Sequence, residues 1–112
     1  MLPNNKLTLS LMEELVLSAL IGHELYGLEI IQAVREATDG KRRISFGSLY
    51  PVLHQLEKRG MVKSHWGDET PEERSGARRK YYAITSPGEA AVREAEAIRT
   101  RLTEWKPLLG RV

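Results

Sequence analysis

The apolar spacing between residues 49 and 56 constrains the fold of this chain more than any other feature. Four apolar residues recur there at intervals of three and four: Leu49, Val52, Leu53 and Leu56. This spacing predicts an amphipathic α-helix that buries one face. Ser45 or Ser48 can cap its start, and Gly60 follows its end. Because Pro51 lacks an N–H, we expect it near the first turn or at a local kink.

Two further helices are predicted before this one. Residues 8–21 are mostly apolar and Gly22 follows them, which is typical of a buried helix with a glycine stop. Apolar residues also recur every three or four positions within residues 24–38, and Asp39-Gly40 then gives a second stop signal. Three short helices, the third entered through a Ser/Gly turn, indicate a helix-turn-helix bundle.

Two stretches with strand character follow the helices. Residues 61–66 alternate loosely between apolar and polar side chains, and residues 79–84 are rich in aromatic and β-branched side chains. The segment 67–76 between them is polar and contains Pro71. These features predict a β-hairpin with a long tip, which is the wing of a winged helix.

The last part of the chain carries a helix start signal and a heptad pattern. In Ser86-Pro87-Gly88-Glu89, serine at the N-cap, proline at N1 and glutamate at N3 form a predicted capping box. Pro107 is expected to end or bend the helix near Lys106. After the start signal, apolar residues recur at alternating spacings of four and three, which is typical of a helix seam between two subunits. The predicted seam comprises Ala91, Ala95, Ile98, Leu102, Trp105 and Leu109.

These elements together predict the fold class. We expect a mainly α protein with a small β-hairpin, in which residues 1–85 form a winged helix-turn-helix domain. Residues 86–112 would form a C-terminal dimerisation helix, so the protein would be a homodimer. The length of 112 residues fits one domain with a modest core that a second subunit would enlarge.

Composition favours a protein of the cytoplasm and gives little support for catalysis. The chain has no cysteine, no signal-peptide pattern and no apolar run long enough for a membrane span. His23, His54 and His65 are scattered, without the spacing of a metal site. No glycine-rich phosphate loop is present, and the carboxylates fall on predicted exposed faces. We therefore expect no enzyme activity, no cofactor and no bound metal.

The polar face of the third helix favours binding to double-stranded DNA. Small and hydroxyl-bearing residues stand at its start, where they allow close approach to phosphates and base edges. His54 and Gln55 can bond to base edges in the major groove, and Lys58 can meet a phosphate. The predicted contacts on this helix are Ser45, Gly47, Ser48, Tyr50, His54, Gln55 and Lys58.

Two basic triplets add to this face, although the net charge is only +2. Lys41, Arg42 and Arg43 precede the third helix, and Arg78, Arg79 and Lys80 begin the second strand of the hairpin. The wing tip carries four acids, Asp68, Glu69, Glu72 and Glu73. These acids would repel phosphate, so we expect the base of the wing, and not its tip, to contact DNA.

A protein-interaction module built on the same scaffold is the alternative, because the net charge is low and the wing tip is acidic. Salt dependence separates the two functions, since each phosphate contact lowers DNA affinity by about 0.9 log units per log unit of salt.

Four segments resemble the PadR family of transcriptional regulators. They are Leu25 to Ile30, Ser45 to Glu57, Gly60 to Val62 and Gly76 to Thr85, within a similarity that runs from about Leu15 to Gly88. The resemblance implies a winged helix whose C-terminal helix forms a homodimer, and a repressor of a palindromic operator. It also implies DNA contacts from Ser45, Gly47, Ser48 and Tyr50, with Arg78, Arg79 and Lys80 in the wing. Phe46 and Leu28 depart from the usual residues.

Two finer expectations follow from the resemblance. A small aromatic effector could bind at Trp105, because some family members hold aromatic drugs between tryptophans of the dimer, although packing between subunits is the favoured role of Trp105. Trp66 is expected to pack within its strand. The compact length and short last helix are also similar to a branch of short PadR-like proteins tied to the cyanobacterial circadian clock, which suggests a clock gene as target.

Overall fold

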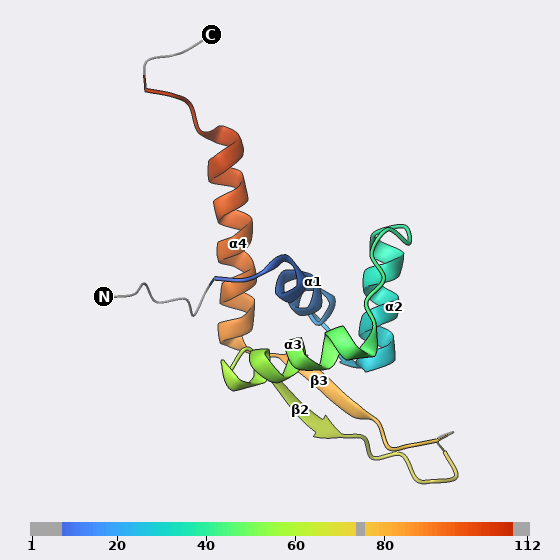
Figure 1. Cartoon of the computed structure of the whole chain (residues 1–112). Helices are drawn as coiled ribbons and strands as arrows, with labels where there is room; N and C mark the ends of the chain where they lie inside the picture. The colour runs from blue at the N-terminus through green and yellow to red at the C-terminus, as the bar shows by residue number, and fades with distance from the viewer. Residues whose placement is uncertain (1–7, 74–75, 109–112) are drawn as a thin grey trace.

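The computed structural model describes residues 8–73 and 76–108. Three helices gather beside a small sheet, while α4 and the β2–β3 hairpin extend from them in opposite directions (Figure 1). None of the helices in these ranges has the length and apolar character needed to cross a membrane. The elements in chain order are α1 (Leu11–Ala19), β1 (Glu24–Tyr26), α2 (Gly27–Ala37), α3 (Phe46–Lys58), β2 (Val62–Trp66), β3 (Lys80–Ile84) and α4 (Ser86–Glu104).

One apolar core joins the first three helices, the sheet and the start of α4. The leucine face predicted for α3 is confirmed, since Leu49, Leu53 and Leu56 are buried and Val52 is half-buried. Among the described residues, the buried set contains no charged side chain. Its members are Val16, Leu17, Leu20, Ile30, Val34, Ile44, Leu49, Leu53, Leu56, Met61, Val62, Tyr82, Ala91 and Val92.

Helix α1 begins at a capping box and is shorter than the predicted range 8–21. The Ser10 Oγ accepts a hydrogen bond from the Glu13 N–H at 3.2 Å, and the Glu13 carboxylate accepts one from the Ser10 N–H at 2.8 Å. Glu13 also pairs with Arg59 at 3.1 Å, and Arg59 donates to the Thr8 carbonyl at 2.9 Å. The start of α1 is therefore tied to the end of α3.

The predicted helix over residues 24–38 is wrong at its first three residues. Glu24–Tyr26 form strand β1, which pairs antiparallel with β3 through Leu25 opposite Tyr82. Helix α2 then begins at Gly27, and Asp39 and Gly40 adopt positive φ angles at its end as the stop signal predicted. The strand was missed because its hydrogen-bonding partner lies far away in the sequence.

The predicted hairpin of residues 61–66 and 79–84 is confirmed, but it forms part of a three-stranded sheet. The order is β1-β3-β2 with all pairs antiparallel. Tyr82 is buried in the core while Tyr81 is half-buried on the other face of the sheet. Strand β3 therefore anchors the wing to the helical core through its central tyrosine.

Helix α4 is capped one residue earlier than the predicted capping box. Thr85, and not Ser86, is the N-cap: its Oγ1 accepts from the Gly88 N–H at 3.2 Å and donates to the Gly60 carbonyl at 2.6 Å. Thr85 thereby joins the start of α4 to the end of α3, a contact that Ser86 does not make. The helix ends at Glu104, so the predicted end near Lys106 is two residues too late.

The first turns of α4 pack against the body of the protein, and its later turns do not. Ala91 and Val92 are buried in the core, while Ile98 and Leu102 are exposed. Arg99 pairs with Glu14 of α1 at 2.6 Å, close to the point where α4 leaves the body. The division of the chain at residue 85 stays a prediction, since the start of α4 shares the core of the preceding helices.

Gly88 supplies a prediction about folding. A Cβ at this position would collide with the Met61 carbonyl oxygen and lie 2.7 Å from Cγ1 of Ile84. Because the obstacle is backbone, we expect Gly88→Ala to lower the free energy of unfolding by about 1–3 kcal/mol. Chemical denaturation measures the change.

Gly47→Ala is the matched control, because a Cβ there meets only the Ser45 Oγ at an ordinary 3.8 Å. Alanine also favours a helix by about 1 kcal/mol over glycine, so this variant should be at least as stable as the parent protein. Equal stability of the two variants would contradict the close packing of α4 on Met61.

Candidate nucleic-acid interface

The predicted contact residues of α3 lie together on its exposed face. Ser45 caps the helix, accepting from the Ser48 N–H at 3.1 Å and donating to the Ser48 Oγ at 3.2 Å. The Leu49, Leu53 and Leu56 side chains fix the helix rotation by being buried. All the predicted contacts on this helix are exposed: Ser45, Gly47, Ser48, Tyr50, His54, Gln55 and Lys58.

Pro51 stands inside α3, beyond its first turn. Because proline has no N–H, the Gly47 carbonyl does not receive the usual backbone hydrogen bond from residue 51. Gly47 and Pro51 both lie on the exposed face of α3. The start of this helix thus exposes the small residues Ser45, Gly47 and Ser48.

Tyr50 is less free than its position off the leucine stripe predicted. Its ring stacks on Phe46 with centroids 5.8 Å apart, and its side chain is 44% exposed. Its hydroxyl lies so close to Gly27 that a Cβ there would collide with it. Phe46, which departs from the usual family residue, therefore helps to hold Tyr50 over the start of α2.

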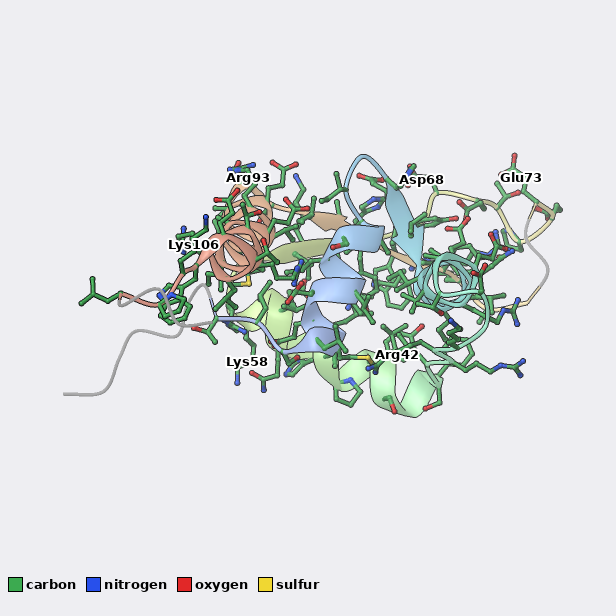
Figure 2. The ribbon with its side chains drawn as sticks, turned by 90° about the horizontal axis from the view of Figure 1, so that it is seen from above. Arg42, Lys58, Asp68, Glu73, Arg93 and Lys106 are labelled. Carbon is green, nitrogen blue, oxygen red and sulfur yellow. The ribbon has the colours of Figure 1, made fainter. Side chains whose placement is uncertain are left out.

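The first basic triplet lies in the loop that leads into α3. Lys41, Arg42 and Arg43 are all exposed, and the loop is held by hydrogen bonds of 3.0 Å from the Arg42 N–H to the Thr38 Oγ1 and from the Lys41 N–H to the Thr38 carbonyl. Figure 2 shows Arg42 and Lys58 on the side of the molecule that α3 occupies, whereas Asp68 and Arg93 lie on the other side.

The second basic triplet makes contacts with aromatic rings at the base of the wing. The Arg79 guanidinium lies 4.6 Å from the centre of the Tyr26 ring. Arg78 and Lys80 lie over the Trp66 ring, at 5.1 and 5.6 Å from its centre. A hydrogen bond with Tyr81 raises the pKa of Arg79 above its ordinary value, so Arg79 stays charged.

The wing base and the start of α3 border a shallow hollow of about 440 Å³. Its lining combines five aromatic residues with the three cations of the second triplet. Sequence reasoning missed Tyr26 and Trp66 as members of this surface, since the alternation within β2 favoured strand packing for Trp66. The lining residues are Tyr26, Leu28, Phe46, Tyr50, Trp66, Arg78, Arg79, Lys80 and Tyr82.

Two acids of the wing tip accept hydrogen bonds within the hairpin. The Glu73 carboxylate accepts from the Thr70 N–H at 2.9 Å, and the Glu73 N–H donates to the Thr70 Oγ1 at 3.3 Å. Glu69 accepts from the Tyr81 hydroxyl at 3.3 Å. Glu73 thus builds the tip, whereas Glu69 reaches back to the Tyr81 that also bonds Arg79, so one acid lies close to a cation of the wing base.

His65 and Glu24 connect the outer strands of the sheet. The His65 Nε2 lies 2.9 Å from the Glu24 carboxylate, and the imidazole stacks on Tyr81 at 5.9 Å. The hydrogen bond with Glu24 raises the pKa of His65, assisted by a bond from its other ring nitrogen to the Trp66 carbonyl. This pair crosses β3 on the face of the sheet turned away from the core.

The predicted dimer seam divides into a buried and an exposed part. Ala91 is fully buried within its own subunit and Ala95 is half-buried. Ala91 therefore belongs to the core of its own subunit and not to an exposed seam. Leu102 and Trp105 are each 69% exposed, and Ile98 is also exposed. Leu108, which the heptad pattern omitted, is also exposed, and Leu109 lies outside the described residues.

No group of three or more histidine, aspartate or glutamate side chains within residues 8–73 and 76–108 could hold a metal ion. The described surface of α3 and the wing base instead combines exposed hydrogen-bonding side chains with two basic triplets. Three packed helices and a three-stranded antiparallel sheet, whose β2–β3 hairpin projects as a wing, are the features of a winged helix-turn-helix protein.

The sequence profile of the transcriptional regulator PadR-like family matches residues 16–94. The chain therefore belongs to the PadR-like family of transcriptional regulators. Family members are regulators and not enzymes, which agrees with the expectation from the sequence.

Similar proteins share the fold over most of this chain. A transcriptional regulator from Clostridium thermocellum is 34% identical, with a TM-score of 0.68 over 83% of this chain and 82% of that one. A PadR-like transcription factor from Bacteroides fragilis is 31% identical, with a TM-score of 0.71 over 83% and 84%. An uncharacterized protein, protein X of Lysinibacillus sphaericus, is 32% identical over 74% of this chain and 72% of the relative. The circadian branch stays a prediction.

The His65–Glu24 pair predicts a pH dependence confined to the wing sheet. Because the folded pKa of His65 is raised, the pair's contribution to stability is fully present below the ordinary pKa of 6.5 and is lost as pH rises through the raised value. We expect Glu24→Gln to lower the His65 pKa toward 6.5, as measured by NMR titration of the imidazole. An unchanged His65 pKa in this variant would contradict the ion pair.

Proposed function

We propose that the protein is a sequence-specific regulator that binds double-stranded DNA as a homodimer and represses transcription from a palindromic operator. The observation that carries the proposal is the exposed polar face of α3, with Arg42 and Lys58 on the same side of the molecule (Figure 2). Membership of a family of transcriptional regulators supports it.

In this proposal α3 is the recognition helix. Its leucine face is held in the core, so His54 and Gln55 point outward and can bond to base edges in a major groove. The capped start of the helix directs its positive dipole end outward and favours nearby phosphates. His54 and Gln55 would supply sequence discrimination, and the helix start would set the position on the duplex.

Phosphate binding would come from the loop before α3 and from the base of the wing. Lys41, Arg42 and Arg43 are exposed on one flank of the recognition helix, and Arg78, Arg79 and Lys80 gather on another. The wing tip carries the acids, so it would not approach the backbone closely. Because the cations gather on the two flanks of α3, a chain of net charge +2 could still bind a polyanion.

A homodimer would bury the apolar residues that α4 leaves exposed. Ile98, Leu102 and Trp105 follow one another at spacings of four and three, and all three are exposed in the single subunit. Exposed apolar surface of this kind is typical of protein–protein contact. We assign Trp105 to this contact in preference to binding a small aromatic effector, because its ring continues the apolar row.

Two copies of α3 in such a dimer would enter successive major grooves about 34 Å apart, one turn of the duplex. Two-fold symmetry of the protein would then require an inverted repeat in the operator. Occupancy of such a site would exclude polymerase, which makes repression the expected outcome.

Selection of genomic fragments at two salt concentrations, followed by sequencing, tests this function. We expect a few fragments that share an inverted repeat. Replacing both base-reading side chains, His54→Ala with Gln55→Ala, should abolish this enrichment and leave weak, salt-sensitive binding, because each lost base contact costs about 1–3 kcal/mol. Enriched fragments beside clock genes would support the circadian prediction.

The matched control removes the same two residue types from the groove between α1 and α2. His23→Ala with Gln32→Ala should select the same fragments as the parent protein, since both residues line that groove and not the α3 face. If the parent protein retains no fragment at either salt concentration, DNA binding is wrong and the protein-interaction alternative is favoured.

Leu102→Glu tests the dimer. A charge within an apolar contact is costly, so this variant should sediment as a monomer at concentrations where the parent protein is a dimer. Thr103→Glu adds the same charge to the neighbouring exposed position, off the apolar row, and should remain dimeric. A dimer of unchanged stability in Leu102→Glu would place the interface elsewhere.

A further inference from the structure

Trp66 occupies an unusual position at the end of β2. It pairs with Lys80 across the sheet, and its side chain lies on the same face as Val62 and Ser64, which alternate with it along the strand. That face covers the core at Val62 but passes beyond the core at Trp66, where it meets the start of α3. A position with the alternation of a core residue therefore carries a ring that is 49% exposed.

The Trp66 ring holds two cations at once. Lys80 is the cross-strand partner of Trp66, and Arg78, which precedes β3, reaches the same ring. Their charged groups lie within 6 Å of the ring centre, the range of a cation–π contact. Within residues 8–73 and 76–108, neither Arg78 nor Lys80 forms an ion pair with an acid.

An aromatic partner leaves the charges available in a way that a carboxylate would not. A guanidinium stacked on a ring keeps the N–H donors at its edge free, and these match the geometry of a phosphate. The ring also limits the rotamers of two long side chains that would otherwise lose their freedom only when DNA binds. Two like charges are thus held close together before any ligand arrives.

We propose that Trp66 is a positioning residue of the DNA interface, which holds Arg78 and Lys80 in the arrangement that meets the backbone phosphates beside α3. The inference rests on the proposed function. Trp66 acts through the two cations and does not itself read or stack on a base. Removing its ring therefore weakens binding only while both cations are present.

DNA affinity measured across a range of salt concentrations tests this role with a mixed-sequence duplex, because phosphate contacts do not depend on sequence. Trp66→Leu should weaken binding about tenfold, because two long side chains must then be ordered when DNA binds, and leave the salt slope unchanged. Arg78→Gln with Lys80→Gln should reduce the slope by about 1.8, from two lost phosphate contacts. Adding Trp66→Leu to this double variant should have no further effect.

Two controls accompany these variants. Trp66→Phe keeps an aromatic face and should recover most of the lost affinity, which separates the ring's role from mere bulk. Lys63→Gln removes one charge from the opposite face of the sheet and should leave the slope unchanged. Circular dichroism verifies that each variant is folded.

The contacts themselves are measurable without DNA. In NMR spectra of the free protein, side-chain protons of Arg78 and Lys80 over the ring should be shifted upfield, and Trp66→Leu should abolish these shifts. Absence of the shifts in the parent protein, or equal DNA affinity of parent and Trp66→Leu, would overturn this inference alone. A tenfold loss that persists in the Arg78→Gln, Lys80→Gln background would show that Trp66 touches DNA directly and would also overturn it. Failure of the parent protein to bind any duplex would overturn both this inference and the proposed function.

Discussion

Burial of the leucine face of α3 is the constraint on which the rest of the surface depends. Because Leu49, Leu53 and Leu56 are buried in the core, α3 cannot rotate about its axis without exposing them. The side chains on the opposite face must then point to solvent, and among them are His54 and Gln55. Gly47 allows a close approach because it has no side chain, and Pro51 removes one helix hydrogen bond. Both are tolerated because they also lie on that outer face.

The sheet extends this fixed orientation to the wing. Tyr82 of β3 is buried in the same core, and β3 pairs with β1 on one edge and with β2 on the other. The base of the hairpin is therefore held beside the start of α3, with its cations against Tyr26 and Trp66. Two basic triplets gather beside α3 while other acids, such as Asp68, lie on the opposite side of the molecule, so a small net charge is compatible with a basic face (Figure 2).

Helix α4 combines two roles along its length. Its first turns complete the core through Ala91 and Val92, and the close approach at Gly88 allows this packing. Its later turns extend away from the body (Figure 1). Leu102, and Trp105 just beyond the end of the helix, are exposed. A heptad pattern alone does not distinguish these parts, because an apolar residue at a regular helical spacing can face its own domain or a second subunit.

The sequence by itself determined the features that depend on near neighbours: the faces of α3, the stops at Gly22 and Asp39-Gly40, the hairpin strands and the basic triplets. Helix periodicity and turn preferences act within a few residues, so one chain segment suffices to reveal them. Only the tertiary structure decided that residues 24–26 form a strand, that Thr85 caps α4, that Ala91 belongs to the core and that Trp66 lies beneath Arg78 and Lys80. The first three depend on partners brought together from distant parts of the chain, and the Trp66 contacts depend on the pairing register of the hairpin. Local spacing encodes neither.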